Sequence, residues 1–271
     1  MAQQTATRED LLTRVRFYRD LGLTEFYRRP VDPELLARLT AAREESQSVP
    51  FPHADSQLNS TADLSPSPSS ALPAAPLIDS ADRAAALQQI RDEMGECTRC
   101  ALHNGRNKIV FGDGSPNARL MFVGEGPGAD EDAQGLPFVG KAGQLLNNMI
   151  AAMGLRREEV YIANVVKCRP PENRVPEQEE GAMCTPFLFR QIDVVRPQVL
   201  VALGATAATW LLGQRQPLAG LRGRIHAFRG MQLIVTYHPA YLLRDPRQKK
   251  EAWADLQMAM RELGLKPPSK G

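Results

Sequence analysis

Four short apolar runs constrain the fold of this chain more than any other feature of its 271 residues. They are rich in Val, Leu and Ile, as strands are, and stretches with helical spacing separate them. This alternation predicts β-α-β-α units with right-handed crossovers, and continuously apolar strands suit a sheet covered on both faces. We therefore expect a three-layer α/β/α domain around a central, four-stranded, mostly parallel sheet. The predicted strands are 119–123, 160–166, 199–203 and 232–236, and the predicted helices are 141–153, 185–195, 205–212 and 248–263.

Composition divides the chain into three parts. Residues 1–45 carry Leu, Arg and Glu at loosely helical spacing, which predicts a short helical N-terminal extension. Residues 46–78 are rich in Ser, Pro and Ala and cannot bury enough apolar surface to offset the entropy of ordering, so we expect a disordered linker. Residues 79–271 hold all four predicted strands and form the expected compact domain.

The overall charge and hydropathy are ordinary. The formal net charge is +2, with 24% charged and 43% hydrophobic residues, so any attraction to nucleic acid would come from a local patch. The N-terminus lacks the apolar core of a secretory signal, and the most apolar stretch, 199–212, is too short to span a bilayer. We expect a cytoplasmic protein without a membrane segment.

The four cysteines are spaced like metal ligands. Cys97 and Cys100 form a C-x2-C pair, whereas Cys168 and Cys184 lie far from each other in the sequence. In a reducing cytosol such thiols bind metal or act in catalysis more often than they form disulfides. Zinc ribbons prefer a second close pair, so the open second half favours an iron–sulfur cluster, with zinc as the alternative.

Polar and glycine-rich segments follow the predicted strands, where ligands bind in open parallel sheets. GEGPGADED starts at Gly124, Asn164 leads into KCRPPENR, Gly204 follows the third strand and YHPAY follows the fourth. No segment matches the dinucleotide fingerprint or the Walker pattern, which disfavours a nucleotide cofactor. Each segment alone has an ordinary structural explanation, but together they predict a site at four converging strand ends.

These motifs carry a resemblance. The run CTRCALHNGRNKIVFGDGSPNARLMFVGEGPGADEDAQGLPFVGKAGQLL, then NVVKCRPPENRVP, Cys184 and YHPAYLLRDP, closely resembles the family 4 uracil-DNA glycosylases, which carry a 4Fe-4S cluster. The resemblance covers about residues 94–263. It implies a uracil-DNA glycosylase-like fold and a bacterial repair enzyme that flips uracil out of single- or double-stranded DNA and hydrolyses its N-glycosidic bond, leaving an abasic site. It also implies a structural 4Fe-4S cluster on the four cysteines, and we expect a monomer; no motif supports a processivity-factor contact.

The resemblance assigns roles within the pocket. Phe138 matches the aromatic residue that stacks on uracil, and Asn164 matches the side chain that reads its edge. An Asn amide can accept from uracil N3–H and donate to O4, whereas cytosine presents the reversed pair. His238 matches the histidine near uracil O2, where a donor stabilises the charge on the departing base. Glu125 and Gly126 are expected to line the pocket through their backbones.

The residue that activates the water nucleophile is assigned less directly. The best-known branch of the superfamily has an Asp at the position of Gly126, which this chain lacks. Glu131 is the first candidate for orienting the water or stabilising the oxocarbenium-like sugar, and Asn173 is the second. The missing Asp also motivates an alternative function, a catalytically silent iron–sulfur module that binds DNA.

DNA contacts are expected from an apolar wedge and from cations around the pocket. Leu242 and Leu243 are the wedge candidates, with Leu242 preferred, and such a leucine would fill the gap left by the flipped base. The predicted phosphate contacts are Lys141, Arg169, Arg174, Arg244 and Arg247.

Overall fold

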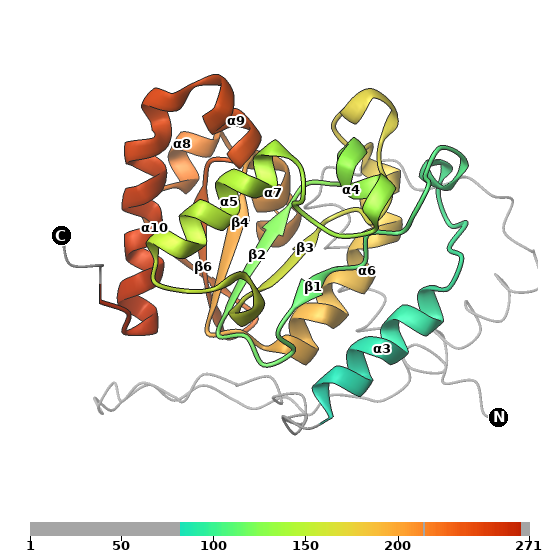
Figure 1. The fold of residues 1–271 in the computed structure, drawn as a ribbon, viewed down its shortest axis with the longest axis horizontal. Coiled ribbons are helices and arrows are strands. Elements are labelled where there is room, and N and C mark those ends of the chain that lie inside the picture. Colours follow the sequence, from blue (N-terminus) through green and yellow to red (C-terminus); the bar gives the residue numbers. More distant parts are fainter. Residues whose placement is uncertain (1–81, 214, 267–271) are drawn as a thin grey trace, which may run out of the picture. The chain divides into compact units, whose positions relative to one another are not determined.

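The computed structural model describes residues 82–213 and 215–266, which belong to one compact unit (Figure 1). The helical extension predicted for residues 1–45 and the linker predicted for residues 46–78 lie outside the described residues. Within the described ranges, no helix combines the length and the apolar character needed to cross a membrane.

Within the described residues, six strands form one mixed sheet in the order β1-β3-β2-β4-β6-β5. The four inner strands are parallel and correspond to the four predicted ones, whereas the two edge strands run antiparallel to their neighbours. The predicted α/β fold is confirmed, and the sheet has two more strands than predicted. The strands are β1 (Asp113–Gly114), β2 (Leu120–Gly124), β3 (Tyr161–Asn164), β4 (Val199–Leu203), β5 (Ile225–Phe228) and β6 (Met231–Thr236).

Helices cover both faces of the sheet, with α5 in front of the strands and α6 behind them in Figure 1. Successive strand residues point to opposite faces. Met121 of β2 packs in the same core as Leu188 of α6, whereas its neighbour Phe122 packs with Leu146 of α5. The helices are α3 (Arg83–Met94), α4 (Ala129–Gln134), α5 (Lys141–Ala152), α6 (Gln178–Val195), α7 (Ala205–Leu212), α8 (Leu218–Leu221), α9 (Pro239–Arg244) and α10 (Lys249–Leu263), with 3-10 turns η1 (Ala101–Asn104), η2 (Arg157–Glu159), η3 (Pro171–Asn173) and η4 (Pro246–Gln248).

Helix α6 begins at Gln178, seven positions before the predicted start at 185. The Glu180 carboxylate accepts the main-chain N–H of Glu177 (2.8 Å), which caps the first turn. Pro186 lies inside the helix, where it removes one backbone donor without ending it. The predicted helix began at residue 185, which would have left Cys184 in the preceding loop. In the structure Cys184 lies within α6.

Candidate active site

A pocket of about 490 Å³ opens at the carboxyl end of the sheet. Residues at or just after the ends of β2, β3 and β6 line this pocket, so three of the four expected strand ends converge there. Gly204, after β4, is not part of the lining, although a Cβ at this position would lie 3.2 Å from Cβ of His238. The pocket lining includes all the residues predicted to bind or act on a base: Glu125, Gly126, Glu131, Phe138, Asn164, Asn173 and His238.

The aromatic wall of the pocket is Phe138, which lies just before α5. Its backbone has a positive φ of 54°, and Arg157 of η2 holds this segment by donating to the carbonyl oxygens of Phe138 (3.1 Å) and Pro137 (2.5 Å). The Phe138 ring centroid lies 5.5 Å from that of His238, with the planes inclined by 34°. The two rings therefore form adjoining walls of one slot.

The floor of the pocket is Asn164, the last residue of β3. Its side chain is 1% exposed, and its Oδ1 is buried without a hydrogen-bond partner. A buried acceptor without a donor costs free energy, so such an atom indicates a place for a ligand donor. Gly124 lies directly opposite in the β2–β3 register, and a Cβ there would overlap the amide oxygen. The small residue makes room for the amide.

His238 is the N-cap of α9 and is held as a neutral imidazole. Its Nδ1 accepts the main-chain N–H of Ala240 (3.1 Å). Burial, followed by repulsion from Arg244, lowers the pKa of His238 to about 4, against an opposing attraction from Glu131. Because Nδ1 is the acceptor, the neutral ring carries its proton on Nε2. The residue is thus a hydrogen-bond donor at neutral pH without being a cation.

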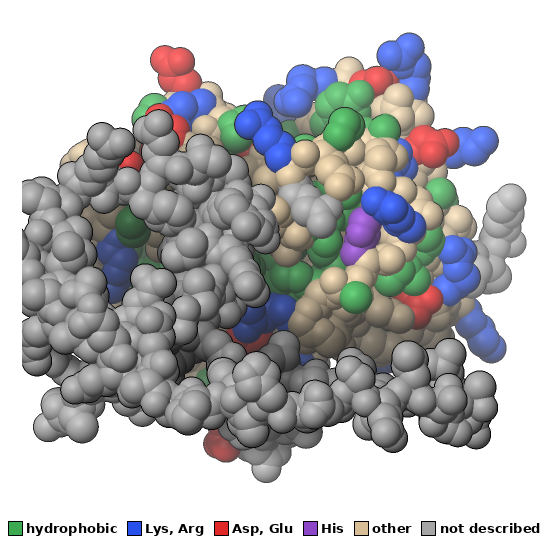
Figure 2. Space-filling model, turned by 180° about the vertical axis from the view of Figure 1, so that it is seen from behind, with side chains coloured by type: hydrophobic (Ala, Val, Ile, Leu, Met, Phe, Trp, Pro, Cys, Tyr) green, Lys and Arg blue, Asp and Glu red, His purple; other side chains and the backbone are tan. Residues whose placement is uncertain are grey.

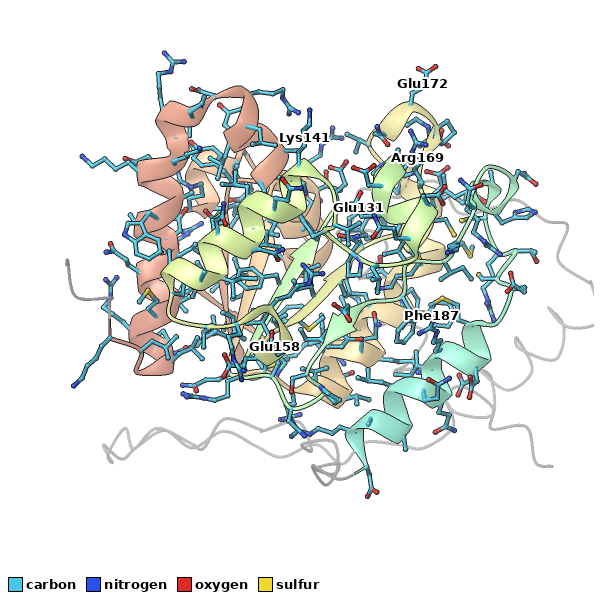
Figure 3. The ribbon with its side chains drawn as sticks, viewed as in Figure 1. Glu131, Lys141, Glu158, Arg169, Glu172 and Phe187 are labelled. Carbon is cyan, nitrogen blue, oxygen red and sulfur yellow. The ribbon has the colours of Figure 1, made fainter. Side chains whose placement is uncertain are left out.

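Glu131 lies in the first turn of α4 and ties this helix to the start of α5 (Figure 3). One carboxylate oxygen accepts the N–H groups of Val139 and Gly140, both at 2.9 Å, and the other accepts the N–H of Gly128 (3.1 Å). Both oxygens are therefore engaged by the backbone. The carboxylate is a fixed negative charge at the pocket wall.

The loop after β3 forms the opposite rim. Glu172 and Asn173 both have positive φ (53° and 55°), and the Oδ1 of Asn173 accepts from Nε of Arg169 (2.8 Å). Arg174 donates to both carboxylate oxygens of the buried Glu180, at 2.8 and 2.7 Å. A bidentate pair of this kind fixes the loop in one position.

The four cysteines line a second pocket, between α3, the segment after β3 and α6. All four are free thiols, and three of their sulfurs accept N–H groups: Cys97 from Arg99 (3.2 Å), Cys184 from the backbone of Lys167 (3.3 Å) and Cys168 from Arg106 (3.5 Å). Burial raises the pKa of Cys184 to about 12 and also raises those of Cys100 and Cys168. In residues 82–213 and 215–266, no three His, Cys, Asp or Glu side chains are grouped so as to hold a metal ion.

Comparison with known proteins assigns the family. Residues 111–257 match the model of the uracil DNA glycosylase superfamily. A type-4 uracil-DNA glycosylase from Thermotoga maritima is 47% identical over 161 residues, which cover 59% of this chain and 84% of that protein. One from Pyrobaculum aerophilum is 44% identical over 180 residues, covering 64% and 92%. This chain belongs to the type-4 uracil-DNA glycosylases. A type-5 enzyme of P. aerophilum is more distant, at 33% identity over 146 residues that cover 48% of this chain and 64% of that protein.

The residues predicted to contact DNA differ in how exposed they are. Leu242 is 1% exposed and cannot act as a wedge, whereas the next residue, Leu243, is 44% exposed. The prediction of Leu242 is wrong because consecutive residues on α9 are turned by about 100° from each other, and Leu242 faces inwards. At the other rim, Val175 is 61% exposed beside the pocket.

The basic residues predicted to contact phosphates differ in their exposure and in whether they form ion pairs with acidic residues. Lys141 and Arg244 are exposed, and Arg244 lines the pocket. Arg247 is exposed but pairs with Asp245 (2.8 Å), and Arg174 is committed to Glu180. Basic side chains with acidic ones between them lie along the upper edge in Figure 2, the edge that carries α9 and η3 in Figure 1. Lys141 and Arg169 approach this edge in Figure 3.

Sequence reasoning missed three supporting residues. Gly124 makes space for the amide of Asn164, and Arg157 fixes the Phe138 segment. Lys167 is fully buried, and its ammonium group donates to the main-chain oxygen of Asn164 (2.9 Å) and to Oε1 of Gln191 (2.6 Å). Burial lowers the pKa of Lys167 to about 8. Only the unusual lysine in an otherwise apolar strand end could have pointed to it.

Proposed function

We propose that this protein excises uracil from DNA by hydrolysing the N-glycosidic bond, which releases free uracil and leaves an abasic site. The observation that carries the proposal is the unpartnered, buried Oδ1 of Asn164 at the floor of a pocket walled by Phe138 and His238. Uracil offers the donor that this oxygen lacks, namely N3–H. Cytosine presents an unprotonated N3 there, so two acceptors would face each other.

In the proposed mechanism, the target nucleotide leaves the base stack and its uracil enters the slot. Phe138 stacks on the base, and Asn164 pairs with N3–H and O4. The bond from C1′ to N1 breaks, its electron pair stays on the base, and Nε2–H of His238 donates to the negative O2. A neutral imidazole suits this step, because its N–H can donate to the developing anion although the ring itself carries no charge.

A water molecule completes the reaction by bonding to C1′ and releasing its proton to solvent. We assign Glu131 to electrostatic stabilisation of the cationic sugar, since both its oxygens already accept backbone N–H groups. Asn173, on the opposite rim, is the candidate for orienting the water. Lys141, Arg169, Arg244 and Arg247 are proposed phosphate contacts, and Leu243, the exposed one of the two candidate leucines, is the proposed wedge.

We infer that Cys97, Cys100, Cys168 and Cys184 hold a 4Fe-4S cluster. The residues fit this group, because four free thiols surround one pocket and three of the sulfurs accept N–H bonds, as cluster ligands do. A 4Fe-4S cluster takes four cysteine thiolates as its ligands, which is the set that this pocket offers. When bound, the cluster supplies a covalent brace between α3, the β3 loop and α6.

The decisive experiment is a gel assay on an oligonucleotide with one uracil, followed by alkali treatment to cleave abasic sites. Protein with its full iron content should give scission, an Asn164→Ala variant should give little, and matched oligonucleotides with cytosine should stay intact. Binding without scission by the iron-loaded wild type would favour the silent DNA-binding module instead. Iron and zinc analysis, with visible absorbance, tests the cluster separately.

A further inference from the structure

Lys167 is a buried cation for which no described residue supplies a buried carboxylate. Its side chain is 1% exposed, and its ammonium group donates to two neutral acceptors, the carbonyl of Asn164 and the amide oxygen of Gln191. The amide of Gln191 is itself fixed, because its Nε2 donates to the Phe111 carbonyl (3.0 Å) and to the Tyr161 hydroxyl (3.2 Å). Neutral oxygens solvate the ammonium group but do not balance its charge.

The buried acids within the described part of the chain are engaged elsewhere. Asp132 accepts from the backbone and side chain of Asn107, Glu180 pairs with Arg174, and Asp255 pairs with Arg222. A buried charge without a partner is unfavourable because the protein interior solvates it poorly. None of these carboxylates is placed to balance the charge of Lys167.

The cysteine pocket offers a different source of negative charge. Lys167 is itself part of its lining, and its backbone N–H donates to Sγ of Cys184 (3.3 Å). Four thiolates around a 4Fe-4S core leave the cluster anionic as a whole. We propose that Lys167 is the counter-ion of this cluster and, through its bond to the main chain of Asn164, couples the cluster to uracil recognition. The inference rests on the cluster proposed above.

The contacts of Lys167 indicate how loss of the cluster would affect the uracil pocket. Asn164 and Lys167 are three residues apart, so the same short segment carries the base-reading amide and the counter-ion. Loss of the cluster would leave the ammonium group without its balancing charge. It would then move towards water and release the carbonyl of Asn164, whose side chain forms the pocket floor. Lys167 is thus a positioning residue and touches no substrate atom.

The test compares two neutral substitutions with a surface control. Lys167→Met removes the charge and the hydrogen bond, whereas Lys167→Gln removes the charge but keeps an N–H donor for the Asn164 carbonyl. Lys108→Met is the matched control, because Lys108 is exposed and lies outside both pockets described above. All proteins are purified anaerobically and compared by circular dichroism, iron content, cluster reduction potential, chelator sensitivity and kinetics.

Both Lys167 variants should show a more negative reduction potential than wild type, since a nearby positive charge stabilises the reduced, more negative cluster. Loss of the cluster to a chelator should be faster by about tenfold or more. KM for uracil DNA should rise most in Lys167→Met. If Lys167→Met does not fold, the potential of Lys167→Gln decides the question.

Wild-type potential and chelator sensitivity in a folded neutral variant would refute the pairing while leaving the glycosylase and its cluster intact. Wild-type protein that holds zinc and no iron would refute the cluster, and this inference with it, without touching uracil excision. Absence of uracil excision by iron-loaded wild type would refute the proposed function and the coupling to uracil recognition, whereas the counter-ion pairing would stand or fall by the reduction potential, which is measured without DNA.

Discussion

Gly124 occupies the position where one added methyl group should do most damage to recognition with least damage to the fold. It ends β2, directly opposite Asn164. A Cβ at this position would overlap Oδ1 of Asn164 and would lie 2.6 Å from Cζ and 2.7 Å from Cε2 of Phe138, closer than real Cβ atoms approach their neighbours. Gly124→Ala must therefore displace the reading amide, the stacking ring or both.

The expected loss follows from the contacts that would be broken. Uracil would lose two hydrogen bonds to the Asn164 amide, each contributing about 1–1.5 kcal/mol. Together they amount to about 2–3 kcal/mol, or a fall in kcat/KM of about 30- to 150-fold. The backbone of Gly124 does not have the positive φ that would strain an alanine, so the free energy of unfolding should change by no more than about 1–2 kcal/mol.

The assay is single-turnover excision from a uracil oligonucleotide, measured beside urea unfolding. Gly220→Ala is the matched control, because a Cβ at Gly220 in α8 meets nothing within 4 Å. This control should keep wild-type kinetics. If Gly124→Ala were as active as Gly220→Ala, the pocket floor would not be the recognition surface, and the reasoning from Asn164 would fail.

Three further outcomes are expected. The pKa of His238 lies near 4 in the folded chain, below its ordinary 6.5, so the unfolded chain binds a proton that the folded chain does not, and stability falls as pH falls from 6.5 towards 4. When the pH is lowered from 7.5 to 5.5, the free energy of unfolding measured in urea should fall by about 1 kcal/mol more for wild type than for His238→Gln. Equal decreases would contradict the neutral-imidazole assignment. Leu243→Ala should slow excision from duplex but not from single-stranded DNA, whereas Leu242→Ala should lower the unfolding free energy by about 2–5 kcal/mol; the reverse pattern would restore Leu242 as the wedge. Chelation of the proposed cluster should lower the melting temperature by about 5 °C or more, and a stripped protein with native melting and activity would leave the cysteines without a bracing role.

The inner part of the fold could be predicted because its signals are local and strong. Each inner strand is a run of buried aliphatic residues, and each main helix shows one apolar face. The edge strands gave no such signal. β1 has only two residues, and β5 has an exposed Ile225 and pairs with β6 through a tight turn at Arg229 and Gly230, both with positive φ. Such turns are usually marked by Asn-Gly, whereas Arg-Gly stands at this turn.

The candidate site was predictable in its members but not in its geometry. Phe138 and His238 stand in the segments that follow β2 and β6, and Asn164 ends β3, so the sheet brings all three into one pocket. Whether Leu242 faces the core and whether Cys184 lies in a helix depend on where α9 and α6 begin. The ends of helices are the features that local sequence determines least. The role of Lys167 depends on contacts across three segments of the chain, which no local pattern encodes.

Release of free base from single-stranded DNA tests the central claim most directly, because it needs neither duplex contacts nor alkali. Iron-loaded protein is incubated with oligonucleotides that differ only in one uracil, cytosine or thymine, and the liberated base is measured by mass spectrometry. The account predicts stoichiometric uracil, no cytosine or thymine, and a loss of release in Asn164→Ala. No free uracil from the wild type, or cytosine released as readily as uracil, would contradict it.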